Sequence, residues 1–488
     1  MSGLQVLRRV VRHEAKLLAA ERSLWVVVLL LAALAAYALF NGQQATRQRE
    51  ALLDQLAHQQ AERLPRMLAQ LQRVRAGQEL PDPFANPADP AAVGSGGAGR
   101  HAWMPYAPLA PLAIGQSDML PNYYRISYRA KSNFMDEGEL ENPWNLLTGR
   151  FDLAFVVVVL MPLLVLALSY NLLSGEREQG TLKLLLAQGL QPHTLLAAKV
   201  ALRFAVVAGT VSVLACAWML WTRPVLEWPA ALQLLNVVAL VCAYVLFWLA
   251  LAVWVNALGR GSAFNALALI GVWVALVLVL PVLMNLAVQT LSPAPSRTEF
   301  ATRNRLVTIE GLNRYQALLS ADYRYVADPE SLRPGPDGRF AVQPRRQAHY
   351  LMARDVDAQL DALRDEFDRQ LEGQQAWVAR LGWLSPAVTT AEGMSASAGT
   401  DAARYLHLRR QVDRFHREWK SFFEPRVLGG MAMTEADYAR LPRFAWQEVP
   451  AAQRGKQALA GLLALLAPTA LLFVLAGRQL QRREGHAP

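Results

Sequence analysis

The sequence contains few cysteines and few charged residues for its length. Among 488 residues there are two cysteines, Cys216 and Cys242, and both lie in apolar runs. This number excludes a disulfide framework or a cysteine metal site. Charged residues make up 18% of the chain and hydrophobic residues 53%, with a mean hydropathy of +0.16. This balance is too apolar for a soluble protein and is typical of a membrane protein with sizeable water-exposed parts.

Patterns for catalysis and for nucleotide binding are also missing. The eight histidines form no HExxH pair, and there is no G-x-S-x-G motif. The stretch GSGGAGRH at 94–101 has the glycine spacing of a phosphate-binding loop, but Arg100 and His101 stand where Lys and Ser or Thr are needed. We interpret it as the end of a flexible Pro/Gly-rich linker, 81–99. We therefore expect a non-catalytic chain with no metal site and no cofactor of its own.

The chain carries a net charge of +10, but its cations do not form a nucleic-acid surface. Much of the excess flanks apolar runs, as cytoplasmic anchoring of membrane helices requires, and no basic recognition motif interleaved with aromatic residues occurs. We therefore expect membrane lipid, and no nucleic acid, as the surroundings of these cations.

Apolar runs predict an all-α membrane protein with six transmembrane helices. A span needs about 20 apolar residues in a helix. The runs that reach or approach this length are 24–41, 152–173, 198–221, 232–257, 264–287 and 457–477.

The short loops give the orientation, because Lys and Arg concentrate on the cytoplasmic side. Cations precede the first span, follow the last one in the tail 478–488, and lie in the 174–197 hairpin and the 258–263 turn. Both termini are therefore predicted to be cytoplasmic.

Residues 1–23 are predicted to form an amphipathic cytoplasmic helix. Arg8, Arg12 and Lys16 recur every fourth residue on one face, as in a helix lying at the membrane surface. The alternative is a cleaved signal peptide whose apolar core begins at Leu24.

Two long segments, 42–150 and 288–454, are predicted to lie outside the cytoplasm. The first begins with leucines at helical spacing, and the second carries apolar stripes at 356–371 and 405–422. Each stripe must be buried, so we expect both segments to pack into one mainly helical extracytoplasmic domain.

Polar residues within the spans are few. Candidate pathway residues are Asn236, Asn256, Asn265 and Asn285, for which interhelical hydrogen bonding is the main alternative. No Asp, Glu or Lys lies deep in a span, so an ion-driven relay is not expected.

The hairpin between the second and third spans is the most informative stretch. Its sequence SGEREQGTLKLLLAQGLQPH begins at Ser174 and places two carboxylates at the start of a short helix, where they suit the helix dipole. A leucine-rich helix follows that is too short to cross a membrane. Such a helix, rimmed by charge, favours docking into a groove on a partner.

The pattern E-R-E-x-G-T-L-x-x-L-L, followed by a turn, resembles the signature of ABC-2 type transporter permeases. In that family the hairpin couples the membrane subunit to a separate ATP-binding subunit. The resemblance assigns this role to Glu176, Arg177, Glu178, Gly180, Thr181, Leu182, Leu185 and Pro192. Arg8, Arg12 and Lys16 match the connecting helix of the family.

The two long segments depart from the simplest members and are similar to a subfamily that carries a domain of unknown function. The stretch GTDAARYLHLRRQVDRFHREWKSFF, 399–423, looks like its recurring part. The resemblance implies a bacterial inner-membrane permease that works as a homodimer or heterodimer with an ABC ATPase subunit, which binds ATP and Mg²⁺. A periplasmic partner is a further expectation. The expected work is export or extraction of an unidentified substrate, or mechanical work outside the membrane.

A different class of function also fits the sequence. A membrane-anchored scaffold or receptor would use the extracytoplasmic domain to bind a partner and the spans only as an anchor. A scaffold has no need of a charged docking hairpin.

Overall fold

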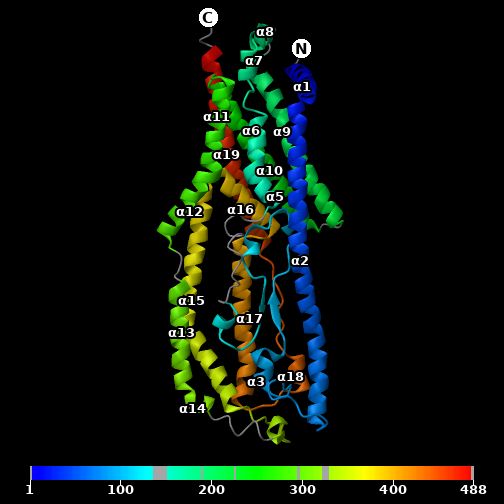
Figure 1. The fold of residues 1–488 in the computed structure, drawn as a ribbon, viewed down its shortest axis with the longest axis vertical. Helices are drawn as coiled ribbons and strands as arrows, with labels where there is room; N and C mark the ends of the chain where they lie inside the picture. The colour runs from blue at the N-terminus through cyan, green and yellow to red at the C-terminus, as the bar shows by residue number, and fades with distance from the viewer. Residues whose placement is uncertain are drawn as a thin grey trace.

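The computed structural model describes residues 3–135, 151–187, 191–224, 227–293, 297–320 and 329–484. The molecule is elongated and almost entirely helical, with both termini at one end (Figure 1). An apolar bundle forms that end, and a polar part, here called the distal domain (43–135 and 297–450), forms the other.

Within the described residues, the bundle contains five helices that are long and apolar enough to span a membrane, by length and composition. The elements of the bundle and its ends are α1 (Gly3–Ala20), α2 (Arg22–Arg75), α5 (Leu153–Phe155), η5 (Val156–Leu160), α6 (Met161–Ala167), α7 (Ser174–Glu178), α8 (Thr181–Ala187), α9 (Pro192–Thr222), α10 (Trp228–Ala257), α11 (Ser262–Trp273), η6 (Val274–Val279), α12 (Leu280–Leu291) and α19 (Ala451–Glu484).

The predicted span 152–173 differs from the other five. Its helix runs only over Leu153–Ala167, shorter than the roughly 20 residues of a full span, and 168–173 form turns. The apolar run therefore continues past the end of the helix.

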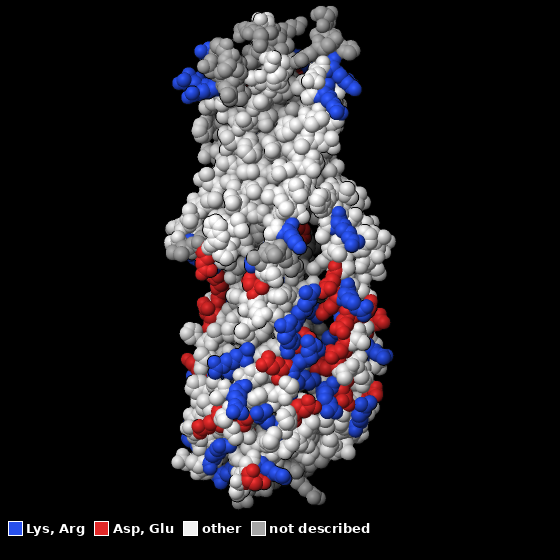
Figure 2. Space-filling view, turned by 180° about the vertical axis from the view of Figure 1, so that it is seen from behind, with Lys and Arg blue, Asp and Glu red and all other residues white. Residues whose placement is uncertain are grey.

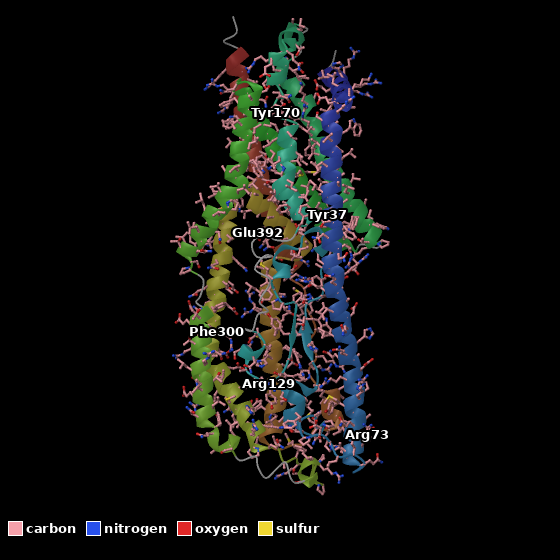
Figure 3. The ribbon with its side chains drawn as sticks, in the orientation of Figure 1. Tyr37, Arg73, Arg129, Tyr170, Phe300 and Glu392 are labelled. Atoms are coloured by element: carbon pink, nitrogen blue, oxygen red, sulfur yellow. The ribbon has the colours of Figure 1, made fainter. Side chains whose placement is uncertain are left out.

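Helix α10 is the centre of the bundle. In its most apolar window 72% of the residues are buried, against 17–33% for the other four candidate spans. The outer helices therefore present apolar surface outward, and Figure 2 shows an almost uncharged band between charged ends. Exposed aromatic side chains lie toward both ends of this band, with Trp25 and Phe264 at one end and Tyr37, Trp221 and Trp228 at the other. In Figure 3 the label Tyr37 lies at the end of the band next to the distal domain, and the label Tyr170 lies toward the end that carries the termini.

The distal domain is assembled from parts of both long segments. Its elements are the second half of α2, α3 (Pro90–Ala92), η1 (Val93–Gly97), β1 (His101–Trp103), η2 (Ala110–Leu112), η3 (Gly115–Asp118), β2 (Tyr123–Arg125), η4 (Lys131–Asn133), α13 (Arg297–Arg314), α14 (Gln316–Leu319), η8 (Pro329–Leu332), α15 (Pro344–Gly382), α16 (Pro386–Ala398), α17 (Ala402–Leu428) and α18 (Glu435–Ala439). β1 and β2 form an antiparallel ribbon with His101 opposite Arg125. α17 begins after Asp401, and the hydroxyl of the neighbouring Thr400 donates to the Ala113 carbonyl.

Helix α16 departs from the expected division between spans and distal domain. Ala387, Met394 and Ala398 belong to the same buried cluster as the spanning helices. The Ser385 hydroxyl donates to the Leu276 carbonyl, and the Asn236 amide donates to the Ser397 hydroxyl at 2.6 Å. The segment 288–454 therefore sends one helix into the bundle.

The glycine-rich stretch is not a flexible linker, and this expectation from the sequence is wrong. Gly94 is buried, and its carbonyl accepts from the Trp419 indole at 3.0 Å. A Cβ at Gly94 would lie 2.7 Å from the Tyr128 ring and 2.8 Å from the Phe423 ring. Glycine is needed here because the backbone packs directly against aromatic rings of the core.

His416 lies in the same core, fully buried on α17. Its Nε2 lies 3.0 Å from the Arg129 carbonyl, and its ring packs against Phe134. Burial lowers the pKa of His416 to about 4, although the nearby Asp357 carboxylate raises it. The imidazole is therefore neutral in the folded protein at pH 7.

Replacing Gly94 by alanine is expected to destabilise the distal domain by about 1–3 kcal/mol, because the added methyl overpacks the core. Thermal unfolding of the full chain in detergent measures this change. Gly455→Ala is the matched control, since no atom lies within 4 Å of the added carbon there. Equal melting temperatures for the two variants would contradict the packing described for Gly94.

The free energy of unfolding is expected to fall as the pH is lowered from about 6.5 to 4. In that window the unfolded chain binds a proton at His416, whereas the folded chain does not until its pKa of about 4. The loss is on the order of 3 kcal/mol from this residue. Denaturant unfolding of native protein and His416→Gln at both pH values measures it, and the same pH dependence in both would refute the assignment.

Candidate functional site

The predicted hairpin lies at the end of the bundle that carries both termini, beside α1 (Figure 1). Its first helix, α7, ends at Glu178, and Gly180 turns the chain with a φ of 74° that favours glycine. Its second helix, α8, is Thr181–Ala187, and Pro192 occupies the first position of α9. The residues 188–190 and the side chain of Leu185 lie outside the described part of the structure.

On α8, Leu184 is 66% exposed and Leu182 is half-buried. A large apolar side chain thus faces outward at the tip of the molecule, on a helix of seven residues that is too short to cross a membrane.

The carboxylate of Glu178 binds the N-terminus of α11. It accepts from the Ser262 amide at 2.7 Å and from the Ser262 hydroxyl at 2.9 Å. These hydrogen bonds lower the pKa of Glu178. Arg177, next to it, donates to the carbonyls of Gly259 and Arg260. Both residues therefore tie the hairpin to the α10–α11 turn.

Glu176 ties the hairpin to α9 instead. It accepts from the Lys199 ammonium at 2.8 Å and from the Thr181 hydroxyl. Burial raises the pKa of Glu176, but these two bonds outweigh it and the net shift is downward. The two carboxylates and Arg177 thus have partners within the chain, a set of long-range contacts that the motif alone does not reveal.

The turns at 168–173 leave backbone groups without helical partners inside an apolar environment. The side chains of Arg203, Asn256 and Asn265, here called the polar cluster, bind them, and all three are buried. Arg203 donates to the Leu168 carbonyl at 2.6 Å, and Asn265 donates to the Tyr170 carbonyl at 3.3 Å.

Asn256 makes the largest number of these contacts. Its amide donates to the carbonyls of Ser169 and Ala252, and its oxygen accepts from the Leu173 amide and from Asn265. The polar cluster therefore joins α9, α10 and α11 to the stretch that leads into the hairpin. The break at 168–173 has no signal in the sequence, because the run stays apolar there.

The four candidate pathway asparagines do not line one path. Asn256 and Asn265 belong to the polar cluster, and Asn236 binds Ser397 near the opposite end of α10. Asn285 is exposed on α12. Three of the four thus make interhelical or helix–turn hydrogen bonds.

Helix α1 packs on α9 by one face. Glu14 and Leu18 are buried there, and Glu14 lies 3.8 Å from Lys199. Arg8, Arg12 and Lys16 are exposed on the other face. α1 and the hairpin therefore share Lys199.

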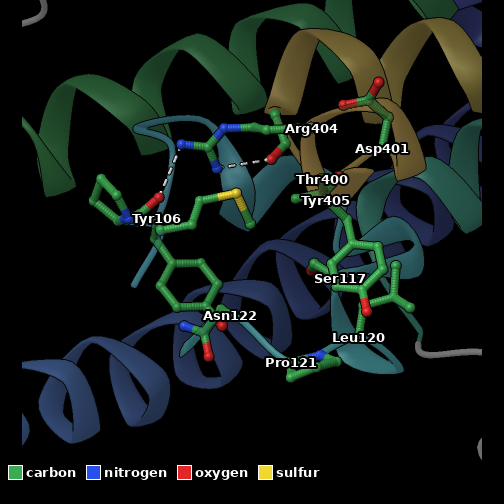
Figure 4. Close-up of a pocket in the computed structure, with 12 residues that line it drawn as sticks. Tyr106, Ser117, Leu120, Pro121, Asn122, Thr400, Asp401, Arg404 and Tyr405 are labelled. Carbon is green, nitrogen blue, oxygen red and sulfur yellow. Dashed lines mark hydrogen bonds between the residues drawn. The ribbon is translucent and has the colours of Figure 1, made fainter. Parts of the chain in front are cut away.

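A small crevice lies at the junction of the bundle and the distal domain, lined by Tyr106, Ser117 and Tyr405 among others (Figure 4). Arg404 at its edge donates to the Pro105 carbonyl and to Glu448. Glu448 has its pKa raised by burial and lowered more strongly by Arg404, to about 2. These groups satisfy one another and hold the junction together. In the described part of the chain, no group of three His, Cys, Asp or Glu side chains is placed to hold a metal ion.

Comparison with known proteins identifies one family model, a domain of unknown function (DUF3526), over residues 341–447. The match contains the stretch 399–423 and runs from α15 to the segment after α18; the hairpin lies outside it. No curated protein matches the chain. No solved structure matches it either.

Proposed function

We propose that this chain is the membrane subunit of an ATP-driven ABC transporter of the ABC-2 type. The observation that carries the proposal is the hairpin, which presents the exposed Leu184 on a short helix and is held at the tip of an apolar bundle by one ion pair and several hydrogen bonds. A separate ATPase subunit, which binds ATP and Mg²⁺, would cover α8.

The geometry divides the motif into two roles under this proposal. Glu176, Arg177 and Glu178 position the hairpin, because their polar atoms already bind α9 and the α10–α11 turn. Leu184, with its neighbours on α8, makes the contact with the ATPase. This revises the assignment from the motif, in which the carboxylates themselves belonged to the docking surface.

The membrane arrangement belongs to the same proposal. The helix Leu153–Ala167 together with 168–173 completes a sixth crossing, because the polar cluster satisfies its open backbone groups. Both termini and the hairpin then lie in the cytoplasm of a bacterial cell. The distal domain lies outside the inner membrane, and two permease chains pair to make the transporter.

Replacing Leu184 by glutamate is expected to weaken copurification with the ABC ATPase subunit of the proposed transporter at least tenfold, because a carboxylate would be buried in an apolar groove. Leu306→Glu is the matched control, since Leu306 is similarly exposed, 57%, but lies on α13 of the distal domain. Pull-down of the two chains from detergent measures the binding. Undiminished binding by Leu184→Glu would exclude α8 as the contact, and no ATPase binding by the native chain would favour the scaffold.

Replacing Asn256 by leucine is expected to leave the affinity for the ATPase within about threefold of the native value. The variant should nevertheless fail to couple movement of the hairpin to ATP hydrolysis. Each buried backbone group that loses its partner costs about 1–3 kcal/mol, so hydrogen exchange at 168–178 should accelerate roughly tenfold or more. Stimulation of ATP hydrolysis by the permease should fall in parallel. Asn285→Leu, the same change at an exposed asparagine, should alter neither quantity. Normal stimulation in Asn256→Leu would show that the polar cluster does not transmit movement of the hairpin.

A further inference from the structure

Helix α13 lies at the outer edge of the distal domain, beside α15, and runs along the length of the molecule (Figure 1). One face of α13 packs against α15. Val307 and Gly311 are buried on that face, and a Cβ at Gly311 would lie 2.8 Å from the Met352 side chain. Phe300 adds a ring contact with Phe367, with 6.2 Å between the ring centroids. This face of α13 therefore has its partner within the chain.

The opposite face of α13 is apolar and exposed. Leu306, Ile309 and Leu312 are 57%, 48% and 41% exposed. At 3.6 residues per turn, these three side chains centre on the face opposite Val307 and Gly311. Single exposed apolar residues are ordinary on a protein surface, but a row of them along one helix face is typical of a surface that a partner covers.

Charged residues flank this apolar row on both sides. Arg305 is exposed and makes no ion pair within the described part of the chain. Glu310, on the other flank, lies 2.9 Å from Arg314, one turn along the same helix. Both of these side chains are exposed, so their ion pair is weak and leaves Glu310 available to a partner.

The membrane restricts how two copies of this chain can meet. Copies inserted in one membrane share one orientation, so a two-fold axis between them runs along the membrane normal and their α13 helices are parallel. In a parallel pair, each apolar residue faces its own counterpart, and a flanking residue faces the partner residue five positions further along. Arg305 of one chain then lies opposite Glu310 of the other. The apolar row and its flanks are therefore complementary to themselves in this orientation.

We propose that α13 packs against α13 of a second copy of this chain, with Ile309 at the two-fold axis. The inference rests on the proposed pairing of two permease chains and names their contact in the distal domain. Because α15 covers the other face, the apolar row admits one partner helix. Two short helices do not associate stably by themselves, but anchoring of both chains in one membrane raises their effective concentration. The hairpin lies at the other end of the molecule, so binding of the ATPase at α8 does not depend on this contact.

The experiment is disulfide cross-linking of the full chain in proteoliposomes without the ATPase. Cys216 and Cys242 are first replaced by alanine, so that an introduced cysteine is the only thiol in the chain. Under mild oxidation, Ile309→Cys should form a linked dimer at least tenfold faster than Ser421→Cys, because a disulfide needs Cα atoms within about 7 Å. Ser421 is the matched control, since it is exposed as well and lies on α17 of the same domain.

Substitutions added to Ile309→Cys test the orientation of the pair. Arg305→Glu should slow the cross-link about three- to tenfold, because it places two carboxylates opposite each other in both halves of the contact. Adding Glu310→Arg to that variant should restore the rate to within about twofold, since the charges are then exchanged and not removed. Leu306→Glu should slow the cross-link at least tenfold, because two carboxylates would be brought together in an apolar contact.

The proposal is overturned if Ile309→Cys cross-links no faster than Ser421→Cys. It is also overturned if oxidation in membranes of the expressing cell links position 309 to a different protein. Failure of Glu310→Arg to restore the rate would exclude the parallel pair. These outcomes are separate from those for the ATPase: a chain that cross-links through position 309 but binds no ATPase supports the pairing and refutes the transporter, and a chain that binds the ATPase without the cross-link does the reverse.

Discussion

The constraint on which this structure depends is that backbone polar groups cannot stay unpaired in an apolar environment. Most of the bundle meets it with continuous helices. The stretch 168–173 does not, and the polar cluster of Arg203, Asn256 and Asn265 supplies the missing partners. The position of the hairpin follows from this, because α7 begins immediately after the turns that the cluster holds.

Helix α10 connects this constraint to the rest of the molecule. Its Asn256 belongs to the polar cluster near one end, and its Asn236 binds Ser397 of α16 toward the other. α16 leads into α17, the helix around which the distal domain packs. A continuous chain of packed and hydrogen-bonded elements thus runs from the hairpin to the distal domain through the most buried helix of the bundle. Such continuity permits mechanical coupling, and whether movement follows it depends on the alternative states of these elements.

The distal domain obeys a different balance of forces. It buries several charges, and the ion pairs of Lys131, Arg364 and Arg404 draw together segments that lie far apart in the sequence. The aromatic rings of its core pack directly against the backbone of Gly94. A domain built in this way is specified by a few long-range polar contacts as well as by apolar area.

The sequence by itself determined the helical class, the apolar runs and the stripes of α15 and α17, because helical periodicity and hydropathy are local properties. It also located the hairpin, with its glycine turn and Pro192 at the start of α9. Only the tertiary structure decided that Glu178 caps α11, that 168–173 leave the helix, that α16 enters the bundle and that the glycine-rich segment is core. Each of these depends on partners tens to hundreds of residues away, such as Ser262 for Glu178 and Trp419 for Gly94. The local sequence does not predict such distant partners. A glycine-rich stretch, for example, has the same local pattern whether it is buried in a core or forms a flexible linker.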